Sequence, residues 1–259
     1  MANKSINIVV AGATGYVGLD LVYLLSRHPN VKIINLCAQK NIGKEINKFD
    51  KRIKKKLPKI TKLKNVNWEK IDLVFLSLPN GEAQKIIKKN YSKFKNLKFI
   101  DLSADFRISS AKKYEGIYNI KHKSKDLINK SLYSIPELSK KEIKKYRIVS
   151  NPGCYPTAAL LALLPIMEYV PKQNILIDAK SGISGAGRNL DSKKLFTAGE
   201  DNFQAYAVKD HRHYPEILSI LQTVDSANSE ELIRGANSGA DFILSVNEKN
   251  LKILDEVKS

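Results

Sequence analysis

Over the first 150 residues, short apolar runs rich in β-branched side chains alternate with segments whose apolar residues recur at helical spacing. A short run of this kind is typical of a strand buried on both faces of a parallel sheet. Helices are predicted after the first and third runs, and the first of them is expected to end before Pro29. The alternation predicts an α/β fold, a Rossmann-like doubly wound parallel sheet with right-handed crossovers. The runs that predict strands are residues 6–12, 31–38, 71–79, 97–103 and 146–153.

The pattern changes near residue 150. Residues 154–170 form a strongly apolar segment with Pro156 in a position that suits a first helical turn, so a helix is predicted there. Residues 174–188 predict a strand that runs into a glycine-rich loop. We therefore expect a Rossmann-like domain over residues 1–150, followed by an α+β domain over 151–222 and a tail over 223–259.

The net charge of +18 is spread along the chain, and its densest stretch is the lysine-rich segment 51–64. Such a stretch can bind nucleic acid. Here it contains no interleaved aromatic residues and lies between two strand-like segments. We interpret it as a solvated basic loop that attracts anionic small molecules, and we expect no nucleic-acid partner.

The compartment is predicted from the apolar runs and the cysteines. No apolar run reaches the roughly 18 to 20 residues that a membrane helix needs. The first apolar run leads directly into a glycine motif, unlike a secretory signal. Two cysteines do not make a disulfide framework. We expect a cytoplasmic protein without a membrane partner.

The segment AGATGYVG carries glycines at 12, 15 and 18, between the first predicted strand and the first predicted helix. Glycines at this junction allow a tight turn, a close approach of backbone to pyrophosphate and close packing of helix on strand. The alternative is an ordinary strand-to-helix turn. The motif predicts a dinucleotide site, and the candidate cofactor-binding residues are Gly12, Ala13, Thr14, Gly15, Tyr16 and Val17.

The end of the second predicted strand bears on the choice of dinucleotide. An NAD site usually has an acidic residue there that binds the ribose hydroxyls. This chain has Gln39 and Lys40, and no acid before Glu45. A cation suits a 2′-phosphate, so Lys40 favours NADP, the alternative being one more surface lysine.

Cys154 lies where a glycine turn becomes a helix, and Cys37 lies inside an apolar strand. The free amides and the dipole of a helix N-terminus stabilise a thiolate. Most free cysteines act as small buried hydrophobes, and we assign that role to Cys37. Cys154 is the candidate nucleophile.

A thiolate nucleophile needs an acid–base partner, and His211 and His213 occupy alternate positions in HRHYPEI. On an extended segment the two would point to the same side. A zinc site is the competing interpretation, but no second Cys or His cluster completes a ligand set, and we expect no metal. The small-residue segment SGISGAGR ends in Arg188, whose guanidinium would suit a carboxylate or phosphate.

A dinucleotide, a cysteine and a histidine together indicate one reaction class. The thiolate attacks an activated acyl carbon, hydride reduces the thioester, and the product aldehyde is released while the histidine moves the proton.

Five motifs in order over residues 6–217 resemble the N-acetyl-gamma-glutamyl-phosphate reductase family: GATGYVG, DLSADFR, SNPGCYPTA, SGISGAGR and HRHYPEI. The resemblance implies NADPH-dependent reduction of N-acetyl-gamma-glutamyl phosphate to the semialdehyde through a Cys154 thioester, in arginine biosynthesis. It implies that the acid–base residue lies in HRH, with His213 favoured over His211. It also implies that SLPNG, with Ser77 and Pro79, and SGISGAG, with Ser184 and Gly185, line the NADP site. The candidate substrate-binding residues are Asn151, Arg107, Arg188 and Glu216.

Two features depart from the family pattern. Asn80 stands where a histidine is expected after the first LP, and the family's sheet segment is missing after HRHYPEI. We therefore expect a substrate domain short of strands, in a homo-oligomer. The alternatives are an NADP-binding remnant without activity, and the related reductase of carrier-bound aminoadipyl phosphate in lysine biosynthesis.

The residues after 217 have two interpretations. In one, residues 230–243 replace the helix that returns to the nucleotide domain in the family. In the other, residues 221–226 form a strand, followed by a helix, a strand and a helix over 229–257, which resembles a piece of a dihydropteroate-synthase-like barrel.

Overall fold

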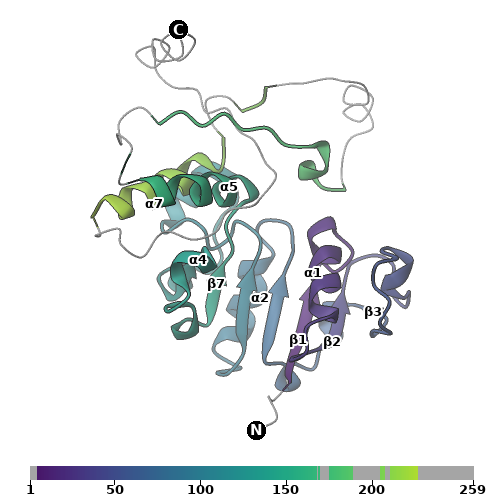
Figure 1. Cartoon of the computed structure of the whole chain (residues 1–259). Coiled ribbons are helices and arrows are strands. Elements are labelled where there is room, and N and C mark those ends of the chain that lie inside the picture. Colours follow the sequence, from purple (N-terminus) through teal and green to yellow (C-terminus); the bar gives the residue numbers. More distant parts are fainter. Residues whose placement is uncertain (1–4, 168, 170–174, 189–204, 208–210, 227–259) are drawn as a thin grey trace. The chain divides into compact units, whose positions relative to one another are not determined.

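The computed structural model describes residues 5–167, 169, 175–188, 205–207 and 211–226. The chain divides into two compact units, Met1–Pro152 and Gly153–Ser259, and Figure 1 labels several of their helices and strands. Each unit is described by itself below.

The first unit is built on a seven-stranded sheet in the order β3-β2-β1-β4-β5-β7-β6, and every strand pair is parallel. The strand order reverses between β1 and β4, where β1 has β2 on its other side. In open α/β sheets, ligands bind at the carboxyl ends of the strands beside such a reversal. The strands are β1 Ile6–Ala11, β2 Val31–Cys37, β3 Ile60–Thr61, β4 Leu73–Leu76, β5 Lys98–Asp101, β6 Ser131–Tyr133 and β7 Ile148–Ser150.

The five predicted strands are confirmed as β1, β2, β4, β5 and β7. Strand β1 shows why a continuous apolar run predicts a strand of this sheet. Val9 and Ala11 pack into one buried cluster, whereas Ile8 and Val10 pack into another, so the strand is apolar on both faces. Burying an aliphatic side chain of this kind contributes about 1.5–3 kcal/mol.

Four helices of the first unit are α1 Tyr16–Ser26, α2 Ala83–Tyr91, α3 Ala111–Tyr118 and the short α4 Pro136–Ser139. Helix α1 ends before Pro29, as predicted. Helix α3 was not predicted from the sequence. Its limits are set by local hydrogen bonding and conformation, because the Ser110 side chain accepts from Lys113 N–H and Asn119 ends the helix at φ 54°.

The second unit contains helix α5 Cys154–Leu163, which continues as the 3-10 turn Leu164–Ile166, and helix α7 Tyr214–Ser226. The prediction of a helix that begins at Cys154 is confirmed. The prediction of a strand over residues 221–226 is wrong, because these residues are the last turns of α7. The β-branched residues Thr223 and Val224 favoured a strand, but the helix that starts at Tyr214 continues through them.

Residues 175–182 contain no strand, only an isolated bridge at Ala179, so the prediction of a strand there is wrong for the described part. The glycine-rich segment that follows forms a 3-10 turn, Ile183–Ala186. The elements predicted over 229–257 lie outside the described residues, as does most of 191–210.

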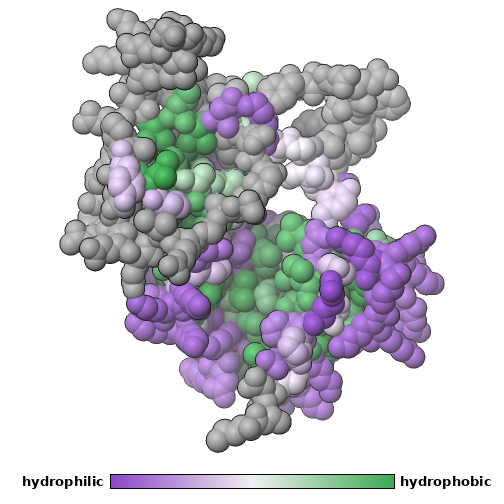
Figure 2. Space-filling model, viewed as in Figure 1, coloured by the Kyte–Doolittle hydropathy of each residue, from purple (hydrophilic) through white to green (hydrophobic). Residues whose placement is uncertain are grey.

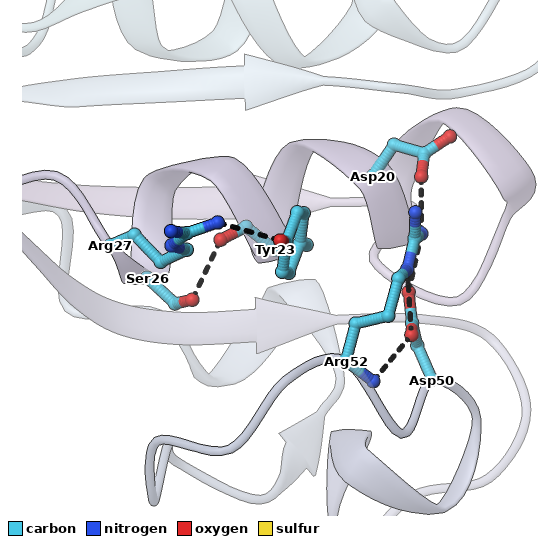
Figure 3. Close-up of polar contacts among 6 residues, drawn as sticks. All are labelled: Asp20, Tyr23, Ser26, Arg27, Asp50 and Arg52. Carbon is cyan, nitrogen blue, oxygen red and sulfur yellow. Dashed lines mark hydrogen bonds and ion pairs between the residues drawn. The ribbon is translucent and has the colours of Figure 1, made fainter.

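The lysine-rich segment 51–64 forms the surface around β3, and all of its lysines are exposed. Figure 2 shows hydrophilic residues along this edge of the first unit. Arg52 attaches the start of the segment to α1, since its guanidinium pairs with Asp20 and with Asp50 and lies 4.9 Å from the Tyr23 ring centroid (Figure 3). Among the described residues, no helix is long and apolar enough to cross a bilayer.

Candidate active site

The glycine turn after β1 is shaped by contacts that exclude side chains. Gly12 has φ 82°, and a Cβ there would lie 1.8 Å from the backbone oxygen of Ser77. A Cβ on Gly18 would lie 2.1 Å from the Gly12 oxygen. Gly15 differs, because it has φ −70° and its added Cβ would meet only the Gly12 oxygen at 3.4 Å, an ordinary contact. Packing therefore requires glycine at 12 and 18, but not at 15.

Helix α1 begins directly after this turn, with Gly15 as its N-cap and no side-chain cap. Gly12 N–H and Ala13 N–H both donate to the Cys37 carbonyl at the end of β2, so the turn is fixed to the sheet. Ala13 is buried, whereas Tyr16 and Val17 are exposed. An uncapped helix N-terminus at the carboxyl edge of a parallel sheet fits a dinucleotide pyrophosphate.

Lys40 is exposed in the bend that follows β2. The bend is tight, with Asn41 at φ 64° and Gly43 at φ 80°. Lys44 donates to the Asn41 side chain at 3.0 Å. A cation at the end of the second strand is in the position from which a ribose 2′-phosphate is bound.

The segment Ser77–Gln84, here called the β4–α2 loop, runs from the end of β4 into the first turn of α2 and adjoins the glycine turn at its first residue. Ser77 N–H donates to the Ala11 carbonyl at 2.9 Å, and Glu82 N–H donates to the Pro79 carbonyl at 3.2 Å. The Asn80 side-chain oxygen accepts from Ala104 N–H at 3.1 Å. A histidine would place its Nδ1, also an acceptor, at the same distance along the side chain. The departure from the family pattern at residue 80 thus keeps an acceptor for this contact.

Arg107 connects the loop after β5 to the end of β7. Its Nε donates to the Asn151 carbonyl and its Nη2 donates to the Leu102 carbonyl, both at 2.9 Å. Asn151 N–H donates in turn to the Asp101 carbonyl at 2.8 Å. Arg107 therefore holds the backbone that leads to Cys154.

Two carboxylates of the segment 101–107 are buried. Asp101 accepts from the Ser103 hydroxyl at 2.7 Å through Oδ1, whereas its Oδ2 is buried without a hydrogen-bond partner among the described residues. Burial, and to a lesser degree repulsion from Asp105, raises the pKa of Asp101 to about 7. The Asp101 carboxyl is thus partly protonated near neutral pH.

In the second unit, Cys154 is exposed and is the first residue of α5. Cys37 is buried in β2, as predicted, and burial raises the pKa of its thiol to about 12. The buried thiol therefore stays protonated and inert. Of the two cysteines, the structure presents Cys154 to a reactant.

Glu216 binds the N-cap residue of that same helix. Its carboxylate accepts from Gly153 N–H at 3.2 Å, and the residue is 2% exposed. Glu216 lies in the first turn of α7, 63 residues further along the chain. The predicted substrate-binding residue thus contacts the backbone next to the cysteine.

His211 and His213 lie next to each other, with ring centroids 5.1 Å apart. They occupy the turn before α7, so the expected extended segment is wrong although the expected proximity is confirmed. His213 N–H donates to Nδ1 of His211 at 3.2 Å. Burial, and to a lesser degree Arg212, lowers the pKa of His211. A neutral imidazole that accepts at Nδ1 carries its proton on Nε2.

Two tyrosines that the sequence did not single out belong to this cluster. The Tyr155 ring lies edge-on to both histidines, at 5.1 Å from His211 and 5.7 Å from His213. Its hydroxyl donates to Ser181 Oγ at 2.8 Å and lies 2.6 Å from the Tyr206 hydroxyl. Burial and the Tyr155 hydrogen bond raise the pKa of Tyr206. Tyr155 could have been suspected because it directly follows the cysteine.

The segment 181–188 contacts this cluster through Ser181. Ser184 and Gly185 lie in the following 3-10 turn and are exposed, as is Arg188. Among the described residues, no group of three or more His, Cys, Asp or Glu could hold a metal ion.

The candidate residues thus form one group in each unit. The first contains the glycine turn, Lys40, Ser77, Pro79, Arg107 and Asn151, and the second contains Cys154, Ser184, Gly185, Arg188, His211, His213 and Glu216. The first group fits a dinucleotide, and the second contains an exposed thiol and two imidazoles.

Comparison with known proteins agrees with this division. Residues 7–146 match the family model of the semialdehyde dehydrogenase NAD binding domain, and residues 154–233 match that of the semialdehyde dehydrogenase dimerisation domain. The first match alone spans more than half of the chain. The chain belongs to the semialdehyde dehydrogenase family.

Curated relatives carry a more particular name. A protein of Ehrlichia ruminantium named N-acetyl-gamma-glutamyl-phosphate reductase is 44% identical over 216 residues, which are 82% of this chain and 61% of the relative. One of Alkaliphilus metalliredigens with the same name is 42% identical, covering 86% of this chain and 64% of the relative. An Arabidopsis thaliana protein described as the probable chloroplastic enzyme is 38% identical, with coverages of 85% and 55%. The chain thus spans about three fifths of the length of the first two relatives.

Solved structures agree on the fold. Aspartate semialdehyde dehydrogenase with NADP from Candida albicans matches with a TM-score of 0.54 at 17% identity, covering 93% of this chain and 66% of that one. A probable aspartate-semialdehyde dehydrogenase from Pseudomonas aeruginosa matches with a TM-score of 0.55 at 15% identity, covering 88% and 68%. The predicted Rossmann-like α/β fold is confirmed.

Proposed function

We propose that the protein reduces N-acetyl-gamma-glutamyl phosphate to N-acetylglutamate 5-semialdehyde and phosphate, with NADPH as reductant. The observation that carries the proposal is the exposed Cys154 at the start of α5, in a chain of the semialdehyde dehydrogenase family. The name of the substrate comes from the relatives at 38–44% identity. As the family resemblance implies, we place this reaction in arginine biosynthesis.

The Cys154 thiolate attacks the acyl carbon, the bond from carbon to phosphate oxygen breaks, and phosphate leaves while the acyl group remains on sulfur. When bound, the nicotinamide supplies the hydride that lowers the acyl group to the oxidation level of an aldehyde. The carbon–sulfur bond then breaks, which releases the aldehyde and restores the thiolate. Glu216 fixes the Gly153 amide and thereby the position of the cysteine.

The histidine pair stabilises charge at the carbonyl oxygen of the substrate. His211 accepts at Nδ1, so its Nε2–H would donate a hydrogen bond that stabilises the negative charge developing on the carbonyl oxygen. The sequence favoured His213, whose backbone N–H fixes the His211 ring in this orientation. We assign this hydrogen bond to His211 and the orientation of its ring to His213.

The cofactor preference rests on Lys40 after β2, in a stretch without an acid until Glu45. Lys40 would pair with the 2′-phosphate of NADP. Lys40→Ala is expected to raise the Kd of NADP about tenfold, through loss of a charge-assisted contact, and to leave the Kd of NAD unchanged. An equal rise in the Kd of NADP and the Kd of NAD would contradict a contact between Lys40 and the 2′-phosphate. We further propose a homo-oligomer, on the basis of the dimerisation-domain match.

The test is the reverse reaction, with N-acetylglutamate semialdehyde, NADP and phosphate supplied and NADPH absorbance followed. Phosphate-dependent turnover is expected in the wild type and is lost in Cys154→Ser. Cys37→Ala is the matched control, because it removes the other, buried cysteine and keeps turnover per folded molecule. Aminoadipate semialdehyde in a parallel assay tests the lysine-pathway substrate.

NADP binding without turnover on either substrate would contradict the proposal and favour a protein that only binds the nucleotide. Turnover that survives Cys154→Ser would contradict the covalent route.

A further inference from the structure

The buried carboxylate of Asp105 connects the loop after β5 to the far end of the β4–α2 loop. Its Oδ1 accepts from Gly81 N–H at 2.7 Å, and its Oδ2 accepts from Gln84 N–H at 3.0 Å. Asp105 is fully buried, and these partners lie 24 and 21 residues earlier in the chain. The carboxylate therefore occupies amides at the start of α2, where a helix favours negative charge.

The surroundings of Asp105 hold the carboxylate in one orientation. The Tyr114 hydroxyl donates to Oδ1 at 2.6 Å, and His122 Nε2–H donates to the Asp105 carbonyl at 2.7 Å. Tyr114, Gln84 and His122 are all buried. Asp101, four residues earlier, differs because its Oδ2 has no partner among the described residues. Both oxygens of Asp105 are thus satisfied, whereas only one of Asp101 is.

The other end of the β4–α2 loop abuts the glycine turn. Ser77 is the residue whose oxygen a Cβ on Gly12 would overlap. Between the two ends, Asn80 accepts from Ala104 N–H, next to Asp105. The loop is thus held at its start by the glycine turn, and at its middle and end by residues 104 and 105.

We propose that Asp105 is a positioning residue for the dinucleotide, acting through the backbone of the β4–α2 loop. The carboxylate binds the backbone N–H of Gly81 and of Gln84, the latter in the first turn of α2. It also fixes residues 77–81 beside the glycine turn. The inference rests on the proposed function only for the identity of the dinucleotide.

The experiment measures NADP affinity by calorimetry, without turnover, in two variants of the same hydrogen-bonded group. Asp105→Asn replaces one acceptor oxygen with an NH2 group that faces a backbone N–H, so the loop loses an anchor. Tyr114→Phe removes one donor to Asp105 but leaves both loop amides bound. We expect the Kd of NADP to rise at least tenfold in Asp105→Asn and less than twofold in Tyr114→Phe. Urea unfolding of both variants is measured alongside.

A second pair of variants tests the same loop without touching Asp105. Asn80→Ala removes the acceptor for Ala104 N–H, and Asn80→His restores an acceptor at the same position. We expect NADP affinity to fall in the alanine variant and to recover in the histidine variant. If Asp105→Asn does not fold, the two Asn80 variants still test whether the anchoring of this loop supports NADP binding.

Equal Kd values in wild type, Asp105→Asn and Asn80→Ala would overturn the inference, and so would losses that follow stability alone in both pairs. These experiments measure NADP binding and not turnover. A protein that binds NADP but turns over no substrate would therefore contradict the proposed function and leave this inference standing. A wild-type protein that does not bind NADP would overturn both.

Discussion

Two glycine-rich segments, residues 12–18 and residues 181–188, are alike in composition but differ in what their glycines contact. In the first, an added Cβ would overlap backbone atoms at Gly12 and Gly18. In the second, the nearest atoms to an added Cβ are Ser184 Oγ at 3.9 Å from Gly182 and Ser181 Oγ at 3.4 Å from Gly185.

The difference separates two reasons for a glycine. At 12 and 18 the fold itself excludes a side chain, whereas at 15 and 185 packing would accept one. A glycine that neither packing nor a positive φ requires, such as Gly15 or Gly185, is explained either by a ligand that approaches the backbone or by nothing structural. The comparison therefore yields variants that separate folding from binding.

Among the single substitutions, the largest effect is expected from Gly12→Ala. The new Cβ overlaps the Ser77 oxygen and the residue must keep φ 82°, so overpacking and backbone strain add. The free energy of unfolding should fall by about 3 kcal/mol. Urea unfolding followed by Trp68 fluorescence reports on this unit, because Trp68 is the chain's single tryptophan. An unchanged midpoint would show that the turn relaxes at little cost.

Gly15→Ala should separate binding from stability. The Cβ meets only an ordinary contact, so the free energy of unfolding should stay within about 0.5 kcal/mol of wild type. The methyl group would stand where the backbone approaches the pyrophosphate, and NADP affinity should fall at least about tenfold, or 1.4 kcal/mol. Calorimetric titration measures the affinity. Unchanged NADP binding would place the phosphates elsewhere.

Raising the pH from 4 to 7 should lower the free energy of unfolding of the first unit, which contains residues 12–18. Asp101 lies on β5 beside β4, and its pKa is raised from 3.8 in the unfolded chain to about 7 in the fold. The folded state therefore binds the proton more tightly. The stabilisation that this tighter proton binding provides is fully present below pH 3.8. It is lost as the pH rises to about 7, and the free energy of unfolding falls by no more than about 1.4 kcal/mol per pH unit.

The matched variant for the pH series is Asp101→Asn, which keeps an acceptor for Ser103 and cannot ionise. Its free energy of unfolding should depend less on pH between 4 and 7 than that of wild type, when both are followed by Trp68 fluorescence. Identical slopes would mean that another group carries the dependence.

The smallest effect is expected from Gly185→Ala. The added Cβ would lie 3.4 Å from Ser181 Oγ, so the free energy of unfolding should change by less than about 0.5 kcal/mol. Circular dichroism in urea measures it. If NADP affinity falls in this variant, Gly185 serves the ligand as Gly15 does, and the two segments differ less than their packing indicates.

The sequence predicted the strands that are apolar on both faces. It missed β3 and β6, of two and three residues, because so short a strand has no readable period. Residues 221–226 were predicted as a strand because of their β-branched residues, although a helix already begins at Tyr214. Local composition was overruled there by the continuation of an existing element.

The site was predictable where a residue's chemistry depends on its local position. The predicted positions of Cys154 at a helix start and of Cys37 within a strand are confirmed, while the role of Cys154 as nucleophile stays a prediction. Asp105 was not singled out, because its partners Gly81, Gln84 and Tyr114 are brought to it only by the fold. The histidines were expected together on an extended segment, but a turn before α7 brings them together.

The hydrogen bond from Gly153 N–H to Glu216 also has a consequence for synthesis of the chain. Its partners are 63 residues apart, so the ribosome must add those residues before the bond can form. The last strand of the sheet ends at Ser150, before the cysteine is made, and domains fold largely in the order of their synthesis. The nascent chain therefore carries a completed sheet and a reactive thiol before the carboxylate that binds next to that thiol exists.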